Sequence, residues 1–437
     1  MGVNPQAEQL NATIRASGAA ILDMFSMRGR GMYFPRQGIL AQSAEAQGRR
    51  INATIGTALE EDGAPMSLPC IAGQVKLDVG SIVAYAPSFG QPALRQIWRK
   101  MMLQKNPSLS DKSFSLPVVT SALTHGLYLC GCLFCDPGDT VLLPDMHWEN
   151  YELIFNLTWG ARLETYPAFA GDGFNVAGFA EKLRKHRSGR LVVLLNFPNN
   201  PSGYTPTPEE AYRLRDELLA ASERGLKIVV LVDDAYFGLV FEEGILRESL
   251  FALLCDLHPN LLAVKLDGAT KEDYVWGFRV GFITYGIAQA QPELYKALEA
   301  KTAGAIRAST SNCSQLAQSL LAKAYFAPDY AIDKQAKYEL LRKRYLEVRR
   351  ILTVHPEYAS QFTPMPFNSG YFMCLKMRRV DPESLRQKLV ADYSTGVVSM
   401  NGVVRLAFSS VPCAQLEELF DNIYRAALEL DQAGAAS

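Results

Sequence analysis

Three residues in the middle of the chain have types and positions that could do chemistry together. Asp233 directly follows an apolar run, Lys271 follows the short stretch 268–270, and Arg279 comes eight residues after the lysine. A carboxylate can hold a positive charge, a lysine amine can attack a carbonyl carbon, and the fork of an arginine suits phosphate or carboxylate. Each fragment alone is unspecific, because loops often carry solvated lysines and helix-capping aspartates. Their joint order along the chain is far more specific.

Short apolar runs supply the elements that would position these side chains. They cover residues 141–143, 191–195, 228–232, 261–264 and 280–283. Runs without polar alternation are typical of strands buried on both faces, as in a parallel sheet. A helical pattern from Pro208 to Ser222 lies between two of them. Strands that alternate with helices predict a layered α/β domain that binds ligands at the carboxyl ends of its strands.

The pattern changes after about residue 317. A long charged helix is expected near 333–352, and short apolar runs follow at 370–375 and 403–408. We therefore expect an α/β fold with a three-layer large domain, whose central sheet is mostly parallel, and a smaller α+β domain built from the N- and C-terminal segments. The expected boundaries are 1–74 for the N-terminal segment, 75–316 for the large domain and 317–437 for the C-terminal small domain.

Composition excludes several classes of protein. The 437 residues carry 44 basic and 45 acidic side chains, and 48% of them are hydrophobic. The balanced charge gives no support for a nucleic-acid partner, and the apolar composition argues against disorder. No basic start followed by an apolar run is visible at the N-terminus, so no secretory signal is expected. We expect a soluble cytoplasmic protein.

Residues 118–135 carry no formal charge and approach the length of a membrane span. Polar residues such as Thr120, Thr124 and His125 interrupt the stretch, and the charged turn at 136–139 ends it. We therefore expect a buried helix and no membrane contact.

The eight cysteines form no spaced framework, so reduced thiols are expected. Cys130, Cys132 and Cys135 could suggest a metal site. No second Cys or His pair follows at zinc-site spacing, and the segment is apolar. We expect no metal.

Over about residues 51–410 the chain resembles the class I/II aminotransferases, the fold-type I enzymes that use pyridoxal 5′-phosphate. The similarity is strongest between Tyr85 and Asn312, and greatest to the aspartate and aromatic aminotransferase branch. It implies that Lys271 forms the Schiff base with the cofactor and then moves the α-proton. Lys265 is the rival lysine, but it breaks the spacing to Arg279.

The resemblance also implies which residues surround the cofactor ring. Asp233 would pair with the pyridine nitrogen; Asp234 is the alternative, but adjacent residues of a strand face opposite ways. Tyr236 and Asn200 would donate to the phenolic oxygen of the cofactor. Trp148 would stack on the ring. A plain turn at Asn200 and a core position for Trp148 are the ordinary alternatives.

The cofactor phosphate would lie between Arg279 and a helix that starts near residue 122, because helix N-terminal amides bind anions. Leu123 and Thr124 belong to that start, and Thr270 adds a hydroxyl. The chain departs from the family here, which often has Gly-Ser at 122–123 and a serine at 268. Cofactor affinity could be weaker for that reason, unless Thr270 compensates.

Substrate contacts follow from the same resemblance. Arg405 matches the arginine that grips the α-carboxylate, and its planar fork suits that task. Gly56 matches the N-terminal strand that closes over substrate, and Asn200 lies on the substrate side as well. Arg307 matches a second arginine that holds the distal carboxylate of aspartate or glutamate across a dimer, although enzymes for aromatic substrates can share its segment. Tyr85 matches a tyrosine that reaches the phosphate of the partner subunit, which implies a homodimer.

The activity implied is transamination by a ping-pong route in a cytoplasmic homodimer. An L-amino acid, either aspartate/glutamate or aromatic, would give its amino group to a 2-oxo acid. A pyridoxal-phosphate-dependent C–S β-lyase shares the first steps and remains an alternative. A non-catalytic cofactor-binding relative is a further one, but Lys271, Asp233, Arg279 and Arg405 are all retained.

Overall fold

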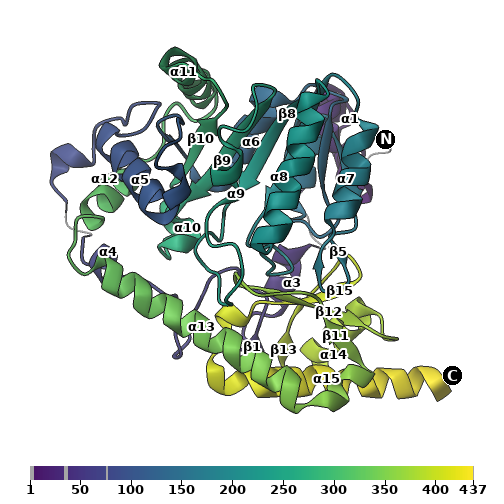
Figure 1. The fold of residues 1–437 in the computed structure, drawn as a ribbon. Coiled ribbons are helices and arrows are strands. Elements are labelled where there is room, and N and C mark those ends of the chain that lie inside the picture. Colours follow the sequence, from purple (N-terminus) through teal and green to yellow (C-terminus); the bar gives the residue numbers. More distant parts are fainter. Residues whose placement is uncertain (1–3, 34–37, 75–76, 437) are drawn as a thin grey trace.

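The central sheet is the frame on which the predicted site is built. The computed structural model describes residues 4–33, 38–74 and 77–436. In this part of the chain a seven-stranded sheet has the order β2-β10-β9-β8-β7-β3-β4 (Figure 1). Its strands are β2 (Val118–Thr120), β3 (Thr140–Pro144), β4 (Arg162–Tyr166), β7 (Arg190–Asn196), β8 (Lys227–Asp233), β9 (Leu261–Gly268) and β10 (Gly281–Gly286). Neighbouring strands from β4 to β9 run parallel, which confirms the expected α/β class with a mostly parallel sheet.

Strand β10 corrects one prediction. It runs antiparallel to both β9 and β2, whereas its apolar run had the pattern of a parallel strand. Only the short helices α10 (Ala269–Glu272) and η4 (Trp276–Phe278) lie between β9 and β10. A parallel return needs a longer crossover, usually a full helix, so the chain turns back instead.

Alternate residues of the central strands pack into different helix layers. Val193 and Leu195 belong to one core, whereas Val192 and Leu194 belong to another. The first core is covered by α7 (Val176–Lys185), α8 (Pro208–Glu223) and α9 (Leu250–Leu254), and the second by α6 (Ala122–Phe134), the π-helix η3 (Glu152–Thr158) and α11 (Pro292–Ser309). The sheet is therefore buried on both faces, which explains its unbroken apolar runs.

Helix α8 begins where the sequence signals predict it. Thr207 and Glu210 form a reciprocal capping box, and Pro208 occupies the first turn. This cap fixes the end of the loop that follows β7, and that loop carries Asn200.

The small domain contains a four-stranded sheet of order β11-β12-β15-β14 in the described residues. Its strands are β11 (Phe362–Pro364), β12 (Met373–Met377), β14 (Val398–Met400) and β15 (Val403–Leu406), and its helices are α14 (Pro382–Asp392) and α15 (Cys413–Ala436). The expected charged helix is α13 (Tyr330–Val354), which runs from the large domain to the small one in Figure 1.

The N-terminal segment divides between the two domains. Strand β1 (Ile51–Asn52) pairs in parallel with β13 (Thr395–Gly396), and α3 (Ile39–Glu45) packs beside it in the small domain. Helices α1 (Pro5–Met24) and α2 (Met27–Gly31) instead lie on the large domain, where the Arg28 guanidinium stands 5.8 Å from the ring centre of Trp159. The remaining helices and strands of the described residues are α4 (Pro69–Ala72), η1 (Val79–Ser81), α5 (Pro92–Lys105), η2 (Pro107–Leu109), β5 (Phe169–Ala170), β6 (Gly173–Phe174), α12 (Gln315–Ala324), η5 (Pro356–Ser360) and η6 (Phe408–Ser410).

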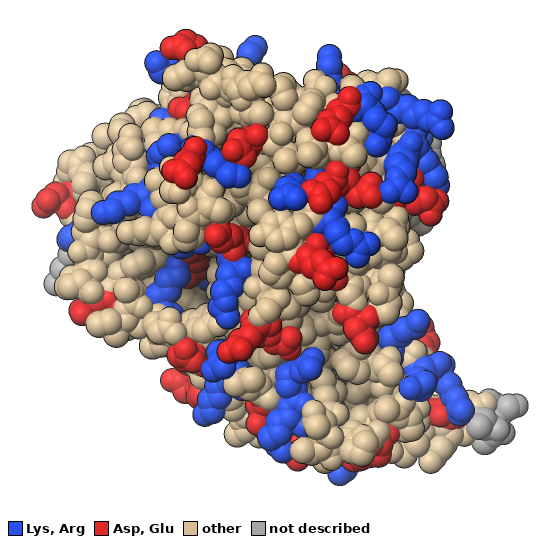
Figure 2. All heavy atoms as spheres, in the orientation of Figure 1, with Lys and Arg blue, Asp and Glu red and all other residues tan. Residues whose placement is uncertain are grey.

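The uncharged stretch 118–135 is not the single helix that was expected, because β2 occupies its first three residues and α6 begins only at Ala122. Among the residues described, no helix combines the length and hydrophobicity that crossing a bilayer requires. Basic and acidic side chains are interspersed over the face in Figure 2.

Candidate active site

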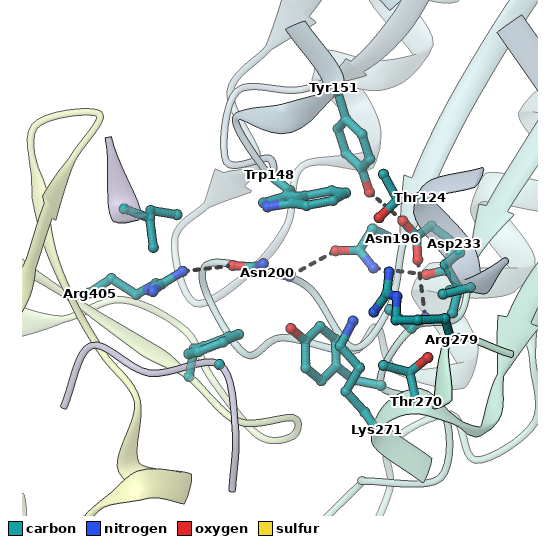
Figure 3. A pocket seen from close by; sticks show the side chains of 17 residues that line it. Thr124, Trp148, Tyr151, Asn196, Asn200, Asp233, Thr270, Lys271, Arg279 and Arg405 are labelled. Atoms are coloured by element: carbon teal, nitrogen blue, oxygen red, sulfur yellow. Dashed lines mark hydrogen bonds between the residues drawn. The ribbon is translucent and has the colours of Figure 1, made fainter. Parts of the chain in front are cut away.

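One cavity of about 420 Å³ brings most of the predicted site residues together at the carboxyl ends of β7, β8 and β9 (Figure 3). The predicted residues that line it are Gly56, Leu123, Thr124, Trp148, Asn200, Asp233, Tyr236, Thr270, Lys271, Arg279 and Arg405. They come from both domains, because Gly56 and Arg405 belong to the small-domain side. A volume of a few hundred cubic ångströms suits a small cofactor with its substrate.

Lys271 lies on α10, directly after β9, and points into the cavity (Figure 3). Its ammonium forms no ion pair among the described residues and stands 5.1 Å from the ring centre of Tyr236. Burial lowers the pKa of Lys271 to about 8; Asp233 opposes this shift, and the positive charge of Arg279 adds to it. The amine is therefore closer to its neutral, nucleophilic form than a surface lysine.

Asp233 ends β8 and is buried. Its Oδ2 accepts a 2.7 Å hydrogen bond from the Tyr151 hydroxyl, and its Oδ1 accepts a 3.1 Å bond from the Ala235 amide. Burial raises the pKa of Asp233, and the hydrogen bond from Tyr151 opposes that rise. A buried carboxylate without an ion-paired cation is suited to hold a protonated ring nitrogen.

The structure separates Asp233 from its sequence neighbour. Asp234 lies outside the cavity, where it accepts a 2.6 Å hydrogen bond from Ser249 and pairs with Lys265. Lys265 is buried and also lies 3.3 Å from Asp267. Both rival candidates are thus partners of one another in the protein interior, away from the cavity wall.

A chain of polar contacts crosses the cavity floor. Asn196 donates a 2.8 Å hydrogen bond from Nδ2 to the backbone carbonyl of Asp233. Its Oδ1 accepts a 2.8 Å hydrogen bond from the backbone N–H of Asn200. Arg405 donates from Nη1 to the side-chain oxygen of Asn200 at 3.3 Å and from Nη2 to the Thr54 carbonyl at 3.0 Å. The Arg405 Nε is buried and has no hydrogen-bond partner among the described residues. A buried guanidinium with an unused donor is well placed to take a carboxylate.

Arg279 and the start of α6 form the end of the cavity where the sequence predicts the phosphate. Arg279 is exposed, and its Nη1 donates to the Trp276 carbonyl at 3.2 Å. Thr270 Oγ1 is buried, and no residue in the described part of the chain hydrogen-bonds to it. Ala122, the first residue of α6, has a φ of +63°, a conformation that favours glycine.

Close packing explains why residue 268 is a glycine. A Cβ added there would lie 2.7 Å from the Val280 carbonyl oxygen and 2.8 Å from the Gly281 Cα. These atoms belong to the backbone of the returning chain and cannot move aside easily. A serine at this position would therefore not fit.

Two predicted residues lie outside the cavity of this subunit. The Tyr85 side chain is 91% exposed. Arg307 is exposed near the end of α11, and its Nη1 donates to Ser311 at 2.7 Å. A role for either residue would require a second subunit, so both assignments stay predictions.

Other lining residues were not predicted from the sequence. Tyr151, Asn196, Ile39 and Phe372 all face the cavity. The sequence held a signal for Asn196, because it ends β7 just as Asp233 ends β8. The two residues are paired in the register of these strands. Tyr151 follows Trp148 by three residues, at helical spacing, and directly precedes the π-helix η3. No signal marked Ile39, which comes from the N-terminal segment.

The residues present fit the pyridoxal 5′-phosphate that the resemblance implies. Trp148 offers a ring face, Asp233 a buried carboxylate and Lys271 an amine without an ion pair. The partnerless hydroxyl of Thr270 lies on the same wall as Arg279, where a phosphate needs donors. In the described part of the chain, no group of three or more His, Cys, Asp or Glu side chains is arranged to hold a metal ion.

Residues 51–423 match the family model described as "Aminotransferase class I and II". The chain belongs to this family. Aspartate aminotransferases, to which the chain is similar, are pyridoxal-phosphate-dependent transaminases, and the chain is an enzyme of this type. The match also covers both halves of the cavity, from Gly56 to Arg405.

Individual aminotransferases are distant in sequence. The cytoplasmic aspartate aminotransferase of Saccharomyces cerevisiae is 24% identical over 321 residues, which cover 70% of this chain and 74% of the yeast protein. An aspartate aminotransferase of Geobacillus stearothermophilus is 26% identical, with 57% of this chain and 58% of that protein covered. A solved aminotransferase structure from Anaerococcus prevotii has a TM-score of 0.80 at 22% identity, with 92% of this chain and 99% of that chain covered. The yeast enzyme's structure has a TM-score of 0.76 at 19% identity, covering 94% and 100%. The solved structures show that the fold is shared.

Proposed function

We propose that this aminotransferase moves the amino group of an L-amino acid to a 2-oxo acid, with Lys271 as the residue that holds the cofactor and carries the α-proton of the substrate. The observation that carries this proposal is the placement of Lys271, Asp233 and Arg405 on one cavity. With a pKa of about 8, Lys271 has a neutral fraction near physiological pH that an unperturbed lysine lacks.

Each side chain has a task that follows from its position. When bound, pyridoxal 5′-phosphate supplies an aldehyde carbon that accepts amines and a ring that takes up electrons from a breaking bond at Cα. Asp233 would keep the ring nitrogen protonated, and Trp148 would cover the ring face. Arg279, Thr124 and Thr270 would hold the phosphate, together with the first amides of α6 at Leu123 and its neighbours. Tyr236 and Asn200 would donate to the phenolic oxygen.

Substrate orientation would depend on Arg405. Its guanidinium is buried, lies 4.4 Å from the ring centre of Phe372 and keeps Nε free for a carboxylate oxygen. A fixed α-carboxylate orients the Cα–H bond toward the Lys271 Nζ, which takes the proton and later returns it. Gly56 lines the same side and would help to exclude water once substrate is bound.

The absorption spectrum of the purified enzyme tests this proposal. With cofactor bound, the visible band should change on addition of aspartate or phenylalanine, and 2-oxo acid should appear in proportion. Lys271→Ala should abolish both changes, while Lys265→Met should leave the Lys271-dependent band in place if the protein folds. A wild-type protein that forms no cofactor band would contradict the proposal. Release of pyruvate and ammonia from a cysteine conjugate, without transfer, would support the β-lyase instead.

We infer a homodimer in which Tyr85 and Arg307 each serve the partner's cavity. Tyr85 is 91% exposed beside Val79 and Val83, which are 69% and 72% exposed, and such an apolar group favours a protein contact. Light scattering should give twice the chain mass. Arg307→Leu should lower kcat/KM for aspartate by about 100-fold and for phenylalanine less than about threefold, because only aspartate carries a distal carboxylate. Equal losses would contradict the role of Arg307.

We also infer a cytoplasmic location. Eight cysteines are present and none is in a disulfide. Reduced thiols are typical of the cytosol, and the yeast relative is described as cytoplasmic. Cell fractionation with a cytosolic marker enzyme tests this, and recovery in a membrane fraction would contradict it.

A further inference from the structure

A second cavity, of about 530 Å³, lies between α5, the first turns of α13 and the loop after β8. Figure 2 shows a hollow with Lys and Arg side chains at its rim, in the region where α5 and α13 approach one another in Figure 1. Lys105, Lys334 and Arg247 lie in its wall, and no acidic residue does so among the described residues that line it. The described residues that line it are all different from those that line the cavity with Lys271.

Two of these cations are held close together by one carboxylate. The Nζ atoms of Lys105 and Lys334 lie 2.6 and 2.7 Å from the same oxygen, Oε1 of Glu272. Lys334 also lies 3.2 Å from Asp273. Both carboxylates are buried behind the lysines and do not line the cavity. The ammonium groups of the two lysines therefore face the cavity while the two carboxylates behind them balance their charge, and a nearby anion would reduce the repulsion between the two ammonium groups.

Arg247 adds a third cation that is not neutralised. It is exposed and forms no ion pair among the described residues; its Nη2 only approaches the Glu242 carbonyl, at 3.5 Å. Side-chain amides of Gln104 and Gln335 and the rings of Tyr330 and Tyr338 complete much of the wall. Amide and guanidinium donors suit oxygen atoms, and the rings offer flat apolar surface.

We propose that this cavity binds a small phosphate-bearing anion. The fork of Arg247 can take two phosphate oxygens, and the ammonium groups of Lys105 and Lys334 can donate further hydrogen bonds to the same anion while they keep their carboxylate partners. The bound anion would share Lys105 and Lys334 with Glu272, the residue next to Lys271. Ligand binding in this cavity would therefore change the contacts of the turn that carries the reactive lysine.

Calorimetric titration of the holoenzyme with inorganic phosphate, at constant ionic strength, tests the proposal; the cofactor keeps its own phosphate site occupied. We expect saturable binding with one phosphate per chain. Arg247→Ala should weaken it about tenfold, and Gln104→Glu should do the same by placing a carboxylate in the wall. Arg213→Ala, which removes an exposed cation from α8, should change nothing. Lys105 and Lys334 are left intact because they hold Glu272.

Phenyl phosphate distinguishes a free phosphate ion from a phosphate ester. Tighter binding of phenyl phosphate than of inorganic phosphate would assign an aromatic ester that uses Tyr330 and Tyr338, and equal binding would assign the free ion. Absence of saturable binding up to about 10 mM, or equal affinity in the wild type, Arg247→Ala and Gln104→Glu, would overturn the proposal.

Discussion

The hydroxyl of Tyr151 donates a 2.7 Å hydrogen bond to Oδ2 of Asp233. Both side chains are buried, and Tyr151 comes from the turn that also carries Trp148. The Ala235 amide binds the other carboxylate oxygen. Asp233 is thus held in one orientation by two donors, although neither donor carries a positive charge. Its position under the cavity depends directly on Tyr151.

Replacing Tyr151 with phenylalanine should therefore lower both stability and activity. The change removes one donor from a buried carboxylate, so the pKa of Asp233 should rise further. We expect about 1–3 kcal/mol lower free energy of unfolding, measured by urea denaturation, and about tenfold lower kcat. Tyr128→Phe is the matched control, because Tyr128 is 37% exposed, on the surface of α6. Equal behaviour of the two variants would mean that the hydrogen bond is unimportant.

The reactivity of Lys271 should depend on pH around its lowered pKa. Since that pKa is about 8, the ammonium loses its proton as pH rises through 8 and is protonated below it. In cofactor-free protein, the rate of Lys271 labelling by an amine-reactive reagent, followed by mass spectrometry, should rise with a midpoint near 8. The labelling rate of surface lysines should rise at a pH about two units higher.

Two variants give opposite shifts of this midpoint. Asp233→Asn removes an interaction that raises the lysine pKa, so the midpoint should move to lower pH. Arg279→Met removes a like charge, so the midpoint should move to higher pH. A midpoint that stays with the surface lysines in every variant would show that Lys271 is not buried as described.

Glu272 should stabilise the fold through its two lysine partners. Burial opposes its ionisation, but Lys105 and Lys334 outweigh burial and lower the pKa of Glu272 to about 2. Because the folded-state pKa lies below the unfolded one, the contribution is present above about pH 4.5 and is lost as pH falls toward 2. Glu272→Gln should cost about 3 kcal/mol at pH 7 by urea denaturation, since two lysines lose their counter-charge.

The pH dependence separates this effect from a loss of packing. The difference between wild type and Glu272→Gln should shrink as pH falls below 4.5, because the wild type then loses the same charge. Glu293→Gln, on the exposed first turn of α11, should cost less than about 0.5 kcal/mol at any pH. A penalty for Glu272→Gln that does not change with pH would contradict the electrostatic account.

Ala122→Gly should stabilise the enzyme. Ala122 has a φ of +63°, where a Cβ is strained and glycine is not. The gain should be about 1 kcal/mol in the free energy of unfolding, because relief of strain exceeds the added chain entropy of glycine. Ala220→Gly, inside α8, is the matched control and should lose about 1 kcal/mol. A loss at both positions would contradict the strain at residue 122.

The sequence by itself determined the α/β layers and most of one cavity. The apolar runs predicted the strands. The polar residues directly after them lie at one edge of the sheet, because parallel strands end on the same side. Lys271 and Asp233 follow such runs, and Pro208 with its acidic first turn predicted the start of α8. Arg405 was expected from the family resemblance alone, because it lies on the antiparallel strand β15 of the small domain. The antiparallel direction of β10 could not, since an apolar run alone carries no direction.

Only the tertiary structure decided the contacts between distant residues. It placed Asp234 with Lys265, and it brought Lys105 and Lys334 to Glu272 from helices 167 and 62 residues away in sequence. It also placed Ile39 on the cavity wall and Tyr151 on Asp233. Local sequence patterns show which face of a segment is buried. The partner of a buried charge depends instead on which elements pack together, and the packing of elements depends on the whole chain.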